Sequence, residues 1–460
     1  MARTPNYQAV TGRRHRVAAP LDERLNDNGA VLELRVTFNV SHEILVGIMN
    51  SAIVLGAGII GVSTALHLKR RGWQVTLIDR KAPGHETSYG NAGMIQAEAV
   101  RPVAMPREFS ALLKIAMGRT NDVRYSLPAL PHHIEPLLRY WWHSAPKRYR
   151  LAIIGWACLI AHATREHDIF IVEAHAENLL RRAGYRQLHR DPAEFALAIR
   201  AAERDQRDFG VRFHALSGRE LAKAEPILRH DLAGAIHWLD TWTVSDPGGL
   251  VAAYASLLQR SGGLVLRGNA HTLTQTGAGW SVETDDGRID AESAVIALGP
   301  WAPDILQNFG YRISLVRKRG YHMHYTGGSS LNLPLVDKAF GYAMAPMARG
   351  IRISTGAELT GRDAPATTIQ LKVAEASARN LIDLGTRAEP EPWFGTRPCV
   401  PDMLPVLGPV PRYRGLWMNI GHGHQGFTLG PATGRLLAEM MSNETPIVDP
   451  FPYRPNRLYA

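Results

Sequence analysis

The sequence predicts a protein of the α/β class, in which parallel strands alternate with helices. Three observations lead to this prediction: a short apolar run at residues 52–55, a helical pattern at residues 60–71, and a second strand pattern at residues 74–78. Buried parallel strands are short and almost wholly apolar, unlike the alternating strands of sheets with one solvated face. The order strand, helix, strand is that of a Rossmann-like, doubly wound sheet.

The turn between the first strand and the helix reads Gly56-Ala57-Gly58-Ile59-Ile60-Gly61, which fits G-x-G-x-x-G. In this pattern the first glycine allows a tight turn, the second lets a pyrophosphate approach the backbone, and the third lets helix and strand pack closely. Asp79 ends the second strand, where a carboxylate accepts hydrogen bonds from a ribose. The predicted dinucleotide contacts are Gly56, Gly58, Ile59, Ile60, Gly61, Asp79 and Arg80.

A run rich in hydroxyl groups and glycine, Thr87-Ser88-Tyr89-Gly90-Asn91-Ala92-Gly93, follows the second strand and favours FAD over NAD. A nicotinamide-binding domain usually continues into another helix and parallel strand, whereas this run can bring amides and side chains against a cofactor. By composition alone it is a surface loop. Its position just beyond Asp79 favours cofactor contacts through Thr87, Ser88, Asn91, Ala92 and Gly93.

From residue 53 to residue 93 the sequence resembles the start of the D-amino-acid oxidase (DAO) superfamily of FAD-dependent oxidoreductases, and most closely its bacterial D-amino-acid dehydrogenases. Three further blocks carry the same resemblance in the same order. They are V-I-A-L-G-P-W-A at residues 295–302, G-T-R-P-C-V-P-D at residues 395–402 and G-H-G-H-Q-G-F-T at residues 421–428. The resemblance implies that these blocks pass near the adenosine, lead to the flavin and lie under its ring, respectively.

The resemblance also implies a Rossmann-like FAD-binding domain of the glutathione-reductase type, interleaved with an α+β substrate domain built on a mostly antiparallel sheet. The expected FAD-binding segments are residues 49–104, 244–306 and 394–445, and the expected substrate segments are residues 105–243 and 307–393. Residues 446–460 are expected to form a C-terminal tail. Residues 1–48 read as a disordered leader ahead of a natural start at Met49, with a targeting arm as the alternative.

The activity implied by the resemblance is oxidation of the bond between the α-carbon and the amine of a D-amino acid. Hydride would pass to FAD, the imine would hydrolyse to a 2-oxo acid and ammonia, and the electrons would pass to a quinone or another acceptor. The substrate carboxylate then needs a cation of fixed geometry. Arg397 matches the arginine of the R-P block, and a guanidinium grips a carboxylate through two parallel hydrogen bonds.

The same resemblance supplies the other candidate site residues. Tyr342 lies in a segment where relatives place a tyrosine on the substrate carboxylate, and Tyr321 is the alternative. A glycine-rich loop at residues 421–430 leads to a helix predicted from Pro431 to Met441, whose amino end would face the reduced flavin. Cofactor contacts are expected at Gly299, Gly423, Gly426 and Thr428, and pocket contacts at His424 and Gln425.

Cysteine and histidine usage bears on metals and on attachment of the flavin. The two cysteines, Cys158 and Cys399, lack metal-ligand spacing, so no metal site is predicted and a reducing cytoplasm is expected. Cys399 stands closer to its Pro-Asp pair than the flavin-linking cysteine of sarcosine-oxidase relatives, so non-covalent FAD is expected. In a chain with 19 histidines, His422 and His424 are interpreted as structural.

Two other functions stay open: oxidation of a secondary amino acid such as hydroxyproline, sarcosine or an opine, and a non-catalytic FAD-binding role in assembly or electron relay. The net charge of +10 is scattered and accompanies no zinc ligands, so nucleic-acid binding is not expected. The apolar residues 151–163 are fewer than the ~20 that span a bilayer. A buried helix is expected there, with peripheral contact to the inner face of the cell membrane as the alternative.

Overall fold

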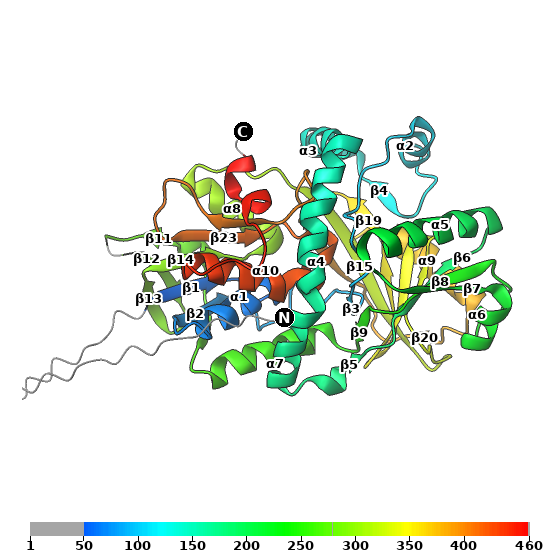
Figure 1. Cartoon of the computed structure of the whole chain (residues 1–460), viewed down its shortest axis with the longest axis horizontal. Coiled ribbons are helices and arrows are strands. Elements are labelled where there is room, and N and C mark those ends of the chain that lie inside the picture. Colours follow the sequence, from blue (N-terminus) through cyan, green and yellow to red (C-terminus); the bar gives the residue numbers. More distant parts are fainter. Residues whose placement is uncertain (1–49, 278, 459–460) are drawn as a thin grey trace, which may run out of the picture. The chain divides into compact units, whose positions relative to one another are not determined.

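The structure is a computed structural model that describes residues 50–277 and 279–458. These residues belong to one unit, residues 48–460, and the predicted leader at residues 1–48 lies outside the described part. The predicted fold class is confirmed, because the described residues form a mainly parallel sheet with helices and a large, mostly antiparallel sheet with helices of its own (Figure 1).

The mainly parallel sheet, which we call the nucleotide sheet, has the strand order β10-β2-β1-β14-β23-β22. Its neighbours pair in parallel except β22 with β23. Segments far apart in the sequence thus lie side by side, as the blue, green and orange strands of Figure 1 show. The strands are β1 (Ser51–Leu55), β2 (Gln74–Asp79), β10 (Leu264–Arg267), β14 (Ser293–Ile296), β22 (Val406–Pro409) and β23 (Leu416–Ile420).

Three helices, α1 (Ile59–Lys69), α7 (Pro247–Arg260) and α10 (Gly426–Met441), accompany this sheet, and both α7 and α10 pack on α1. The start of α7 is capped by Asp246, whose carboxylate accepts a hydrogen bond from the Gly249 N–H at 2.9 Å. The N-cap of α1 is Gly58, which has no side chain to take that role. The amino end of α1 is therefore suited to receive an external anion.

Helix α10 begins at Gly426, five residues before the predicted start at Pro431. Proline is common at the first helical position and rare farther inside, because it has no N–H to donate to the carbonyl four residues earlier. Here the carbonyl of Phe427, four residues earlier, accepts a hydrogen bond from Nε2 of His167 at 2.8 Å instead. A side chain from a distant helix therefore satisfies the carbonyl that Pro431 leaves free, and the helix extends toward the site.

The apolar segment at residues 151–163 lies within the long helix α4 (Pro146–Ala174), which packs against α7 and α10. Its inward side chains, such as Trp156, Leu159 and Ile160, are buried, whereas Leu151 and Ile154 are exposed. The helix is therefore largely part of the core, as expected. Among the described residues, no helix combines the length and apolar character needed to cross a bilayer.

The large sheet has the strand order β4-β19-β15-β18-β17-β16-β6-β8-β7, and the long strand β15 also pairs with β20 and β21. Only β4 with β19 and β6 with β16 are parallel pairs. The strands are β4 (Val123–Tyr125), β6 (Tyr185–His189), β7 (Phe213–Ser217), β8 (Gly234–Trp238), β15 (Val316–Thr326), β16 (Leu335–Asp337), β17 (Tyr342–Met347), β18 (Gly350–Thr355), β19 (Ala357–Leu359), β20 (Thr386–Arg387) and β21 (Trp393–Cys399).

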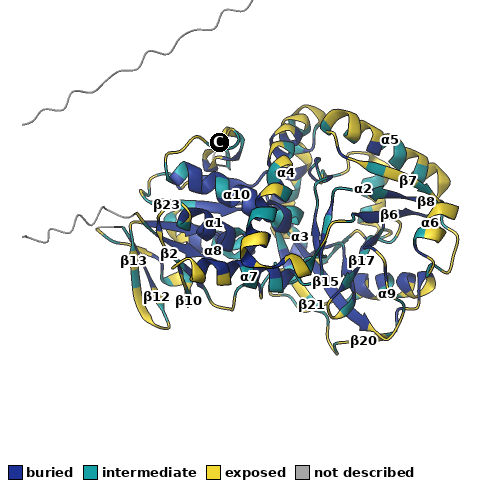
Figure 2. Ribbon diagram, turned by 60° about the horizontal axis from the view of Figure 1, so that its bottom comes forward, coloured by how far each residue is buried: buried dark blue, intermediate teal, exposed yellow. Residues whose placement is uncertain are grey.

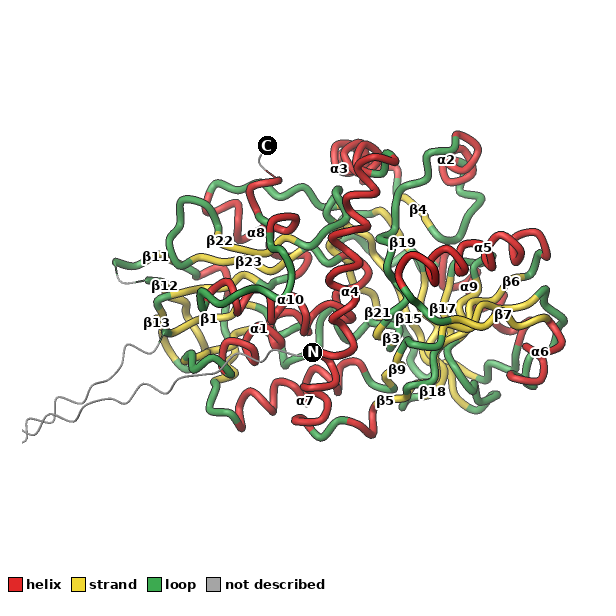
Figure 3. The backbone as a smooth tube through the Cα atoms, viewed as in Figure 1, coloured by secondary structure: helices red, strands yellow, loops and turns green. Residues whose placement is uncertain are grey.

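Strand β21 carries the R-P block and pairs with β15 along its whole length. The predicted domain boundary at residue 394 therefore falls inside a strand of the large sheet. The remaining α-helices of the described residues are α2 (Phe109–Ala116), α3 (Leu130–His143), α5 (Pro192–Phe209), α6 (Gly218–Ala224), α8 (Ala302–Leu306) and α9 (Ile369–Leu381) (Figure 3).

Two small sheets connect the main elements. One contains β11 (Thr274–Gln275), β12 (Trp280–Thr284) and β13 (Gly287–Ala291), and the other contains β3 (Met94–Ile95), β9 (Trp242–Val244) and β5 (Leu180–Arg181). Burial follows the sheets: their central strands and the inner faces of α1 and α10 are buried, whereas α2, α5 and the outer turns are largely exposed (Figure 2).

Candidate cofactor and substrate site

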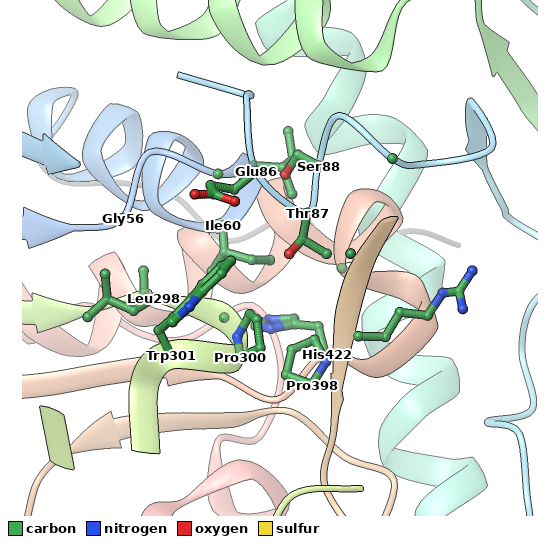
Figure 4. A pocket seen from close by; sticks show the side chains of 18 of the residues that line it. Gly56, Ile60, Glu86, Thr87, Ser88, Leu298, Pro300, Trp301, Pro398 and His422 are labelled. Atoms are coloured by element: carbon green, nitrogen blue, oxygen red, sulfur yellow. Dashed lines mark hydrogen bonds between the residues drawn. The ribbon is translucent and has the colours of Figure 1, made fainter. Parts of the chain in front are cut away.

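A cavity of about 320 Å³ extends from the glycine turn after β1 to strand β21 of the large sheet. Glu86 and Ser88 lie on one wall and Pro300 and Trp301 on the other (Figure 4). Most of the residues predicted from the sequence line it. They are Gly56, Gly58, Ile59, Ile60, Asp79, Arg80, Thr87, Ser88, Asn91, Ala92, Gly299, Arg397, Gly423, His424 and Gly426.

The glycine turn has no room for side chains. Gly56 has φ of 106°, and a Cβ there would lie 2.5 Å from the carbonyl oxygen of Ala297. A Cβ on Gly61 would lie 1.7 Å from the carbonyl oxygen of Gly56. Gly61 is not among the cavity-lining residues, so it acts by letting α1 pack against the turn.

Two polar side chains tie the turn to its neighbours. Asp79 accepts hydrogen bonds from the backbone N–H of Ala57 at 2.7 Å and of Lys81 at 3.0 Å. Ser88 accepts one from the N–H of Ile59 at 3.0 Å, so it caps α1 from a distant loop. A carboxylate has about four acceptor positions, so Asp79 retains capacity for a ligand hydroxyl.

The loop at residues 87–93 is held by contacts that the sequence pattern did not indicate. The Asn91 carboxamide oxygen accepts hydrogen bonds from the N–H groups of Gly93 and Met94, which closes a local turn. Arg352 on β18 donates through Nη1 to the carbonyl oxygens of Tyr89 at 2.9 Å and Asn91 at 2.6 Å. Gly93 does not line the cavity, and its φ of 70° serves the turn.

The cavity fits the cofactor that the sequence implies. The hydroxyl oxygen of Thr87 and the carboxamide oxygen of Asn419 are buried there without a hydrogen-bond partner among the described residues. Buried polar atoms are normally satisfied, so these atoms are suited to a bound ligand. At the Asp79 end, Trp301 presents an aromatic ring with the Arg80 guanidinium 4.5 Å from its centre. A ribose acceptor, a phosphate turn and an aromatic wall therefore occur in one continuous cavity.

Arg397 lines the same cavity as Asp79, from strand β21 of the large sheet. Its Nη1 donates to the carbonyl oxygen of Gly356 at 2.8 Å and its Nη2 to that of Thr355 at 3.1 Å. The guanidinium crosses β15 at Gly320, where a Cβ would lie 2.5 Å from Nη1. No carboxylate of the described residues pairs with it, and burial lowers its pKa. A guanidinium stays protonated even so, which leaves an uncompensated positive charge beside the cavity.

Both histidines of the G-H-G-H block are neutral. Burial lowers the pKa of His422 to about 3, and its Nε2 lies 3.0 Å from the hydroxyl oxygen of Thr433. Burial and the cations Arg397 and Lys318 hold the pKa of His424 well below its usual range. Because such an imidazole is a weak base, the structural interpretation of His422 agrees with its environment. His424 lines the cavity, and its Nε2 has no partner among the described residues.

The expected position of Tyr342 does not hold. Its hydroxyl oxygen lies 3.3 Å from that of Ser377 on α9, and Tyr342 is absent from the cavity lining. In β17 its side chain faces α9 because alternate residues of a strand point to opposite faces of a sheet. The alternative, Tyr321, does line the cavity, although its hydroxyl donates to the carboxylate of Glu358.

Gln425 and Thr428 are joined to each other instead of lining the main cavity. Thr428 donates to the Gln425 carboxamide oxygen at 2.7 Å, and the Gln425 amide donates to Gln96 at 2.8 Å. Gln96 lines the cavity and carries no motif that would have identified it. Trp301 lies inside the 295–302 block but was not singled out. Lys318, described below, sits in a strand whose sequence gives no sign of a site.

Cys399 is buried and lines a second, smaller cavity of about 50 Å³ instead of the main one. Burial raises the pKa of its thiol, and the cations Lys318 and Arg397 act in the opposite direction. The smaller cavity, which we call the annex, shares Gly423 and His424 with the main cavity. The two cavities therefore adjoin at the G-H-G-H block.

Comparison with known proteins identifies the family of this chain. Residues 51–440 match the DAO family, described as FAD dependent oxidoreductase. The chain is 31% identical to D-amino acid dehydrogenase 2 of Ralstonia nicotianae, covering 87% of this chain and 98% of that one. It is 29% identical to the D-amino-acid oxidase of Bradyrhizobium diazoefficiens, covering 88% and 98%.

A solved structure agrees. The iminodiacetate oxidase of Chelativorans sp. BNC1 superposes with a TM-score of 0.65 at 25% identity, covering 88% of this chain and 98% of that one. Two independent comparisons, by sequence and by structure, thus lead to the same kind of enzyme. This protein is a member of the DAO family of FAD-dependent oxidoreductases.

Proposed function

We propose that this protein oxidises the α-carbon–amine bond of a D-amino acid to an imine, which hydrolyses to a 2-oxo acid and ammonia. The observation that carries the proposal is Arg397, a half-buried arginine without a carboxylate partner among the described residues, in a cavity that also contains the glycine turn. The family membership and the D-amino-acid relatives support the same substrate class. The non-catalytic alternative is not carried forward, because the family consists of oxidoreductases.

In this proposal the protein binds and orients the substrate while FAD, when bound, accepts the hydride. Arg397 uses two of its five N–H groups on the carbonyls of residues 355 and 356, which fixes the guanidinium plane. The remaining N–H groups then hold the substrate carboxylate and aim its α-carbon. Gly426 and Phe427 place the amino end of α10 at the cavity, where it stabilises negative charge.

The residues of the site also limit how the amine loses its proton. His422 and His424 are poor bases at neutral pH, since burial depresses the pKa of both. We therefore propose that the amine is deprotonated by solvent before hydride transfer. We further propose that FAD is held without a covalent link, because Cys399 faces the annex and its thiol is kept neutral by burial.

An anaerobic substrate panel tests the proposal. The FAD-loaded protein is mixed with D-amino acids, the matching L-amino acids, and secondary amines, and the absorbance of the oxidised flavin near 450 nm is followed. D-amino acids should bleach the flavin and yield ammonia and a 2-oxo acid. Bleaching by L-amino acids alone, or by no amino acid, would remove the proposal.

A second candidate, oxidation of a secondary amino acid, is favoured by the resemblance to iminodiacetate oxidase. The same arginine would hold the carboxylate of such a substrate. The products separate the two candidates. An open-chain secondary amine such as iminodiacetate releases a primary amine when its imine hydrolyses, and hydroxyproline gives a cyclic imine, whereas a D-amino acid releases ammonia. Flavin bleaching by sarcosine, hydroxyproline or iminodiacetate, faster than by any D-amino acid, would establish the second candidate.

For the electron acceptor we propose a quinone in the membrane. Large apolar side chains are exposed on α2, on α3 and the short 3-10 helix Leu127–Ala129 before it, and at the start of α4: Phe109, Leu127, Leu138, Trp142 and Leu151 are each at least 55% exposed. Arg107 and Arg148 stack 3.9 Å over the rings of Trp141 and Trp142. Apolar side chains interspersed with cations suit an anionic lipid surface on the cytoplasmic face.

Vesicle binding tests this acceptor. The protein should sediment with phosphatidylglycerol vesicles and less with phosphatidylcholine, and it should reduce a short-chain ubiquinone faster than oxygen. The double variant Phe109→Glu and Trp142→Glu should lose sedimentation while flavin bleaching by substrate is retained. Equal sedimentation of the variant and the wild type would contradict the membrane proposal.

A further inference from the structure

The strand pair that carries the half-buried Arg397 also carries a second cation, which is buried. Lys318 on β15 stands directly opposite Arg397 on β21 in the antiparallel register. Cross-strand partners have their side chains on the same face of the sheet and close together. Lys318 is buried, with 8% of its surface exposed, and Arg397 is half-buried, so two positive charges lie close together with little access to solvent.

The described residues supply little to balance the Lys318 ammonium. Its Nζ donates one hydrogen bond, at 3.4 Å, to the hydroxyl of Tyr140, and lies 4.5 Å from the centre of that ring. No carboxylate of the described residues pairs with it. An ammonium has three N–H groups, so two remain. Like charges that face each other with little access to solvent and no paired acid destabilise a protein, which points to a ligand that compensates for them.

The space for such a ligand exists beside Lys318. The annex is lined by Lys318, Tyr140, Gly423 and His424, and it adjoins the main cavity at Gly423 and His424. Nε2 of His424, which has no partner among the described residues, is a further hydrogen-bonding atom in this region. Arg101 also lines the annex, but Asp205 and Asp208 already neutralise it.

We propose that Lys318 and His424 form a second anion subsite beside Arg397, so that the substrate is an amino acid with an acidic side chain. This inference rests on the proposed function, in which Arg397 holds the α-carboxylate. The side-chain carboxylate of the substrate then extends into the annex, accepts hydrogen bonds from the Lys318 ammonium, and compensates for the second buried charge. A substrate with an amide in place of that carboxylate has the same shape and lacks the charge.

The test compares acids with their amides in the FAD-loaded, full-length protein. The ratio of kcat/KM for D-glutamate to that for D-glutamine, and for D-aspartate to D-asparagine, should exceed tenfold in the wild type. In Lys318→Met, which keeps the apolar stem and removes the charge, this ratio should fall at least tenfold. Lys223→Met, at an exposed lysine on α6, is the matched control and should leave the ratio unchanged.

Two outcomes would overturn the subsite. The first is a wild-type kcat/KM that is as high for the amides as for the acids. The second is an equal decrease in kcat/KM for acid and amide in Lys318→Met, because that result would assign Lys318 a role toward the cofactor or the fold. If Lys318→Met does not fold, the same acid-to-amide ratio of kcat/KM is measured in Lys318→Gln, and the ratio in the wild type still tests the subsite.

A binding measurement separates failure of the subsite from failure of the proposed function. Glutarate and pentanoate have the same chain length and differ by one carboxylate, and neither is oxidised. Isothermal titration should give a dissociation constant at least tenfold lower for glutarate in the wild type, and similar constants for both in Lys318→Met. That result would sustain the anion subsite even if no D-amino acid bleached the flavin, whereas equal constants in the wild type would reject it.

Discussion

Replacing Arg397 by lysine perturbs the carboxylate site while conserving its charge. The guanidinium spends one N–H on each of the carbonyls of Thr355 and Gly356 and keeps three for the cavity. An ammonium that satisfies the same two carbonyls has one N–H left. The substrate carboxylate then loses at least one charge-assisted hydrogen bond, which contributes about 1.5–3 kcal/mol.

That loss converts to a decrease in kcat/KM of roughly 10- to 150-fold for Arg397→Lys, at about 1.4 kcal/mol per factor of ten. Stopped-flow reduction of the flavin at several concentrations of a D-amino acid gives kcat/KM for flavin reduction, and the flavin content is measured on the same sample. The exposed replacement Arg200→Lys is the matched control and should stay at the wild-type value.

A second change perturbs the same group without touching it. Gly320→Ala would place a methyl group 2.5 Å from Nη1 of Arg397, so the guanidinium must move off its two carbonyls. Its kcat/KM should also decrease, while the charge of the site is unchanged. If both Arg397→Lys and Gly320→Ala remained within threefold of the wild type, Arg397 would not be the carboxylate ligand.

Three further predictions concern the cofactor, Tyr342 and pH. Gly61→Val should purify without flavin, because even a Cβ at this position would lie 1.7 Å from the carbonyl oxygen of Gly56. The control is Gly277→Ala, where a Cβ meets nothing within 4 Å. The control should keep the wild-type ratio of absorbance at 450 nm to absorbance at 280 nm. Tyr342→Phe should change kcat/KM less than threefold, since the Tyr342 hydroxyl faces Ser377. A tenfold decrease would instead indicate that Tyr342 contacts the substrate. His167 and His422, with pKa values lowered to about 4 and about 3, bind protons in the unfolded chain but not in the folded one. Below the unfolded pKa near 6.5 the free energy of unfolding should therefore fall, by about 2 kcal/mol per histidine between pH 7.5 and 5, and a urea midpoint equal at both pH values would contradict this.

The sequence alone determined the nucleotide half of the site because its information is local. A strand, a glycine turn and a helix follow one another within 20 residues, and their φ angles and close contacts demand glycine at Gly56 and Gly61 whatever the rest of the chain does. Asp79 follows from the same unit, since it ends the next strand. The R-P block is also a short contiguous pattern, and it was identified through its resemblance to the DAO superfamily.

Only the tertiary structure decided the substrate half, because its residues meet across strands that are distant in the sequence. The face of β17 on which Tyr342 lies depends on register, and a shift of one residue reverses it. Helix α10 extends past Pro431 because His167, 260 residues away from Phe427, supplies the missing hydrogen bond. Lys318 becomes a candidate binding residue only when β15 pairs with β21 and sets it beside Arg397, where no carboxylate of the described residues pairs with either cation. Such pairings are long-range contacts, and no local pattern of residue types records them.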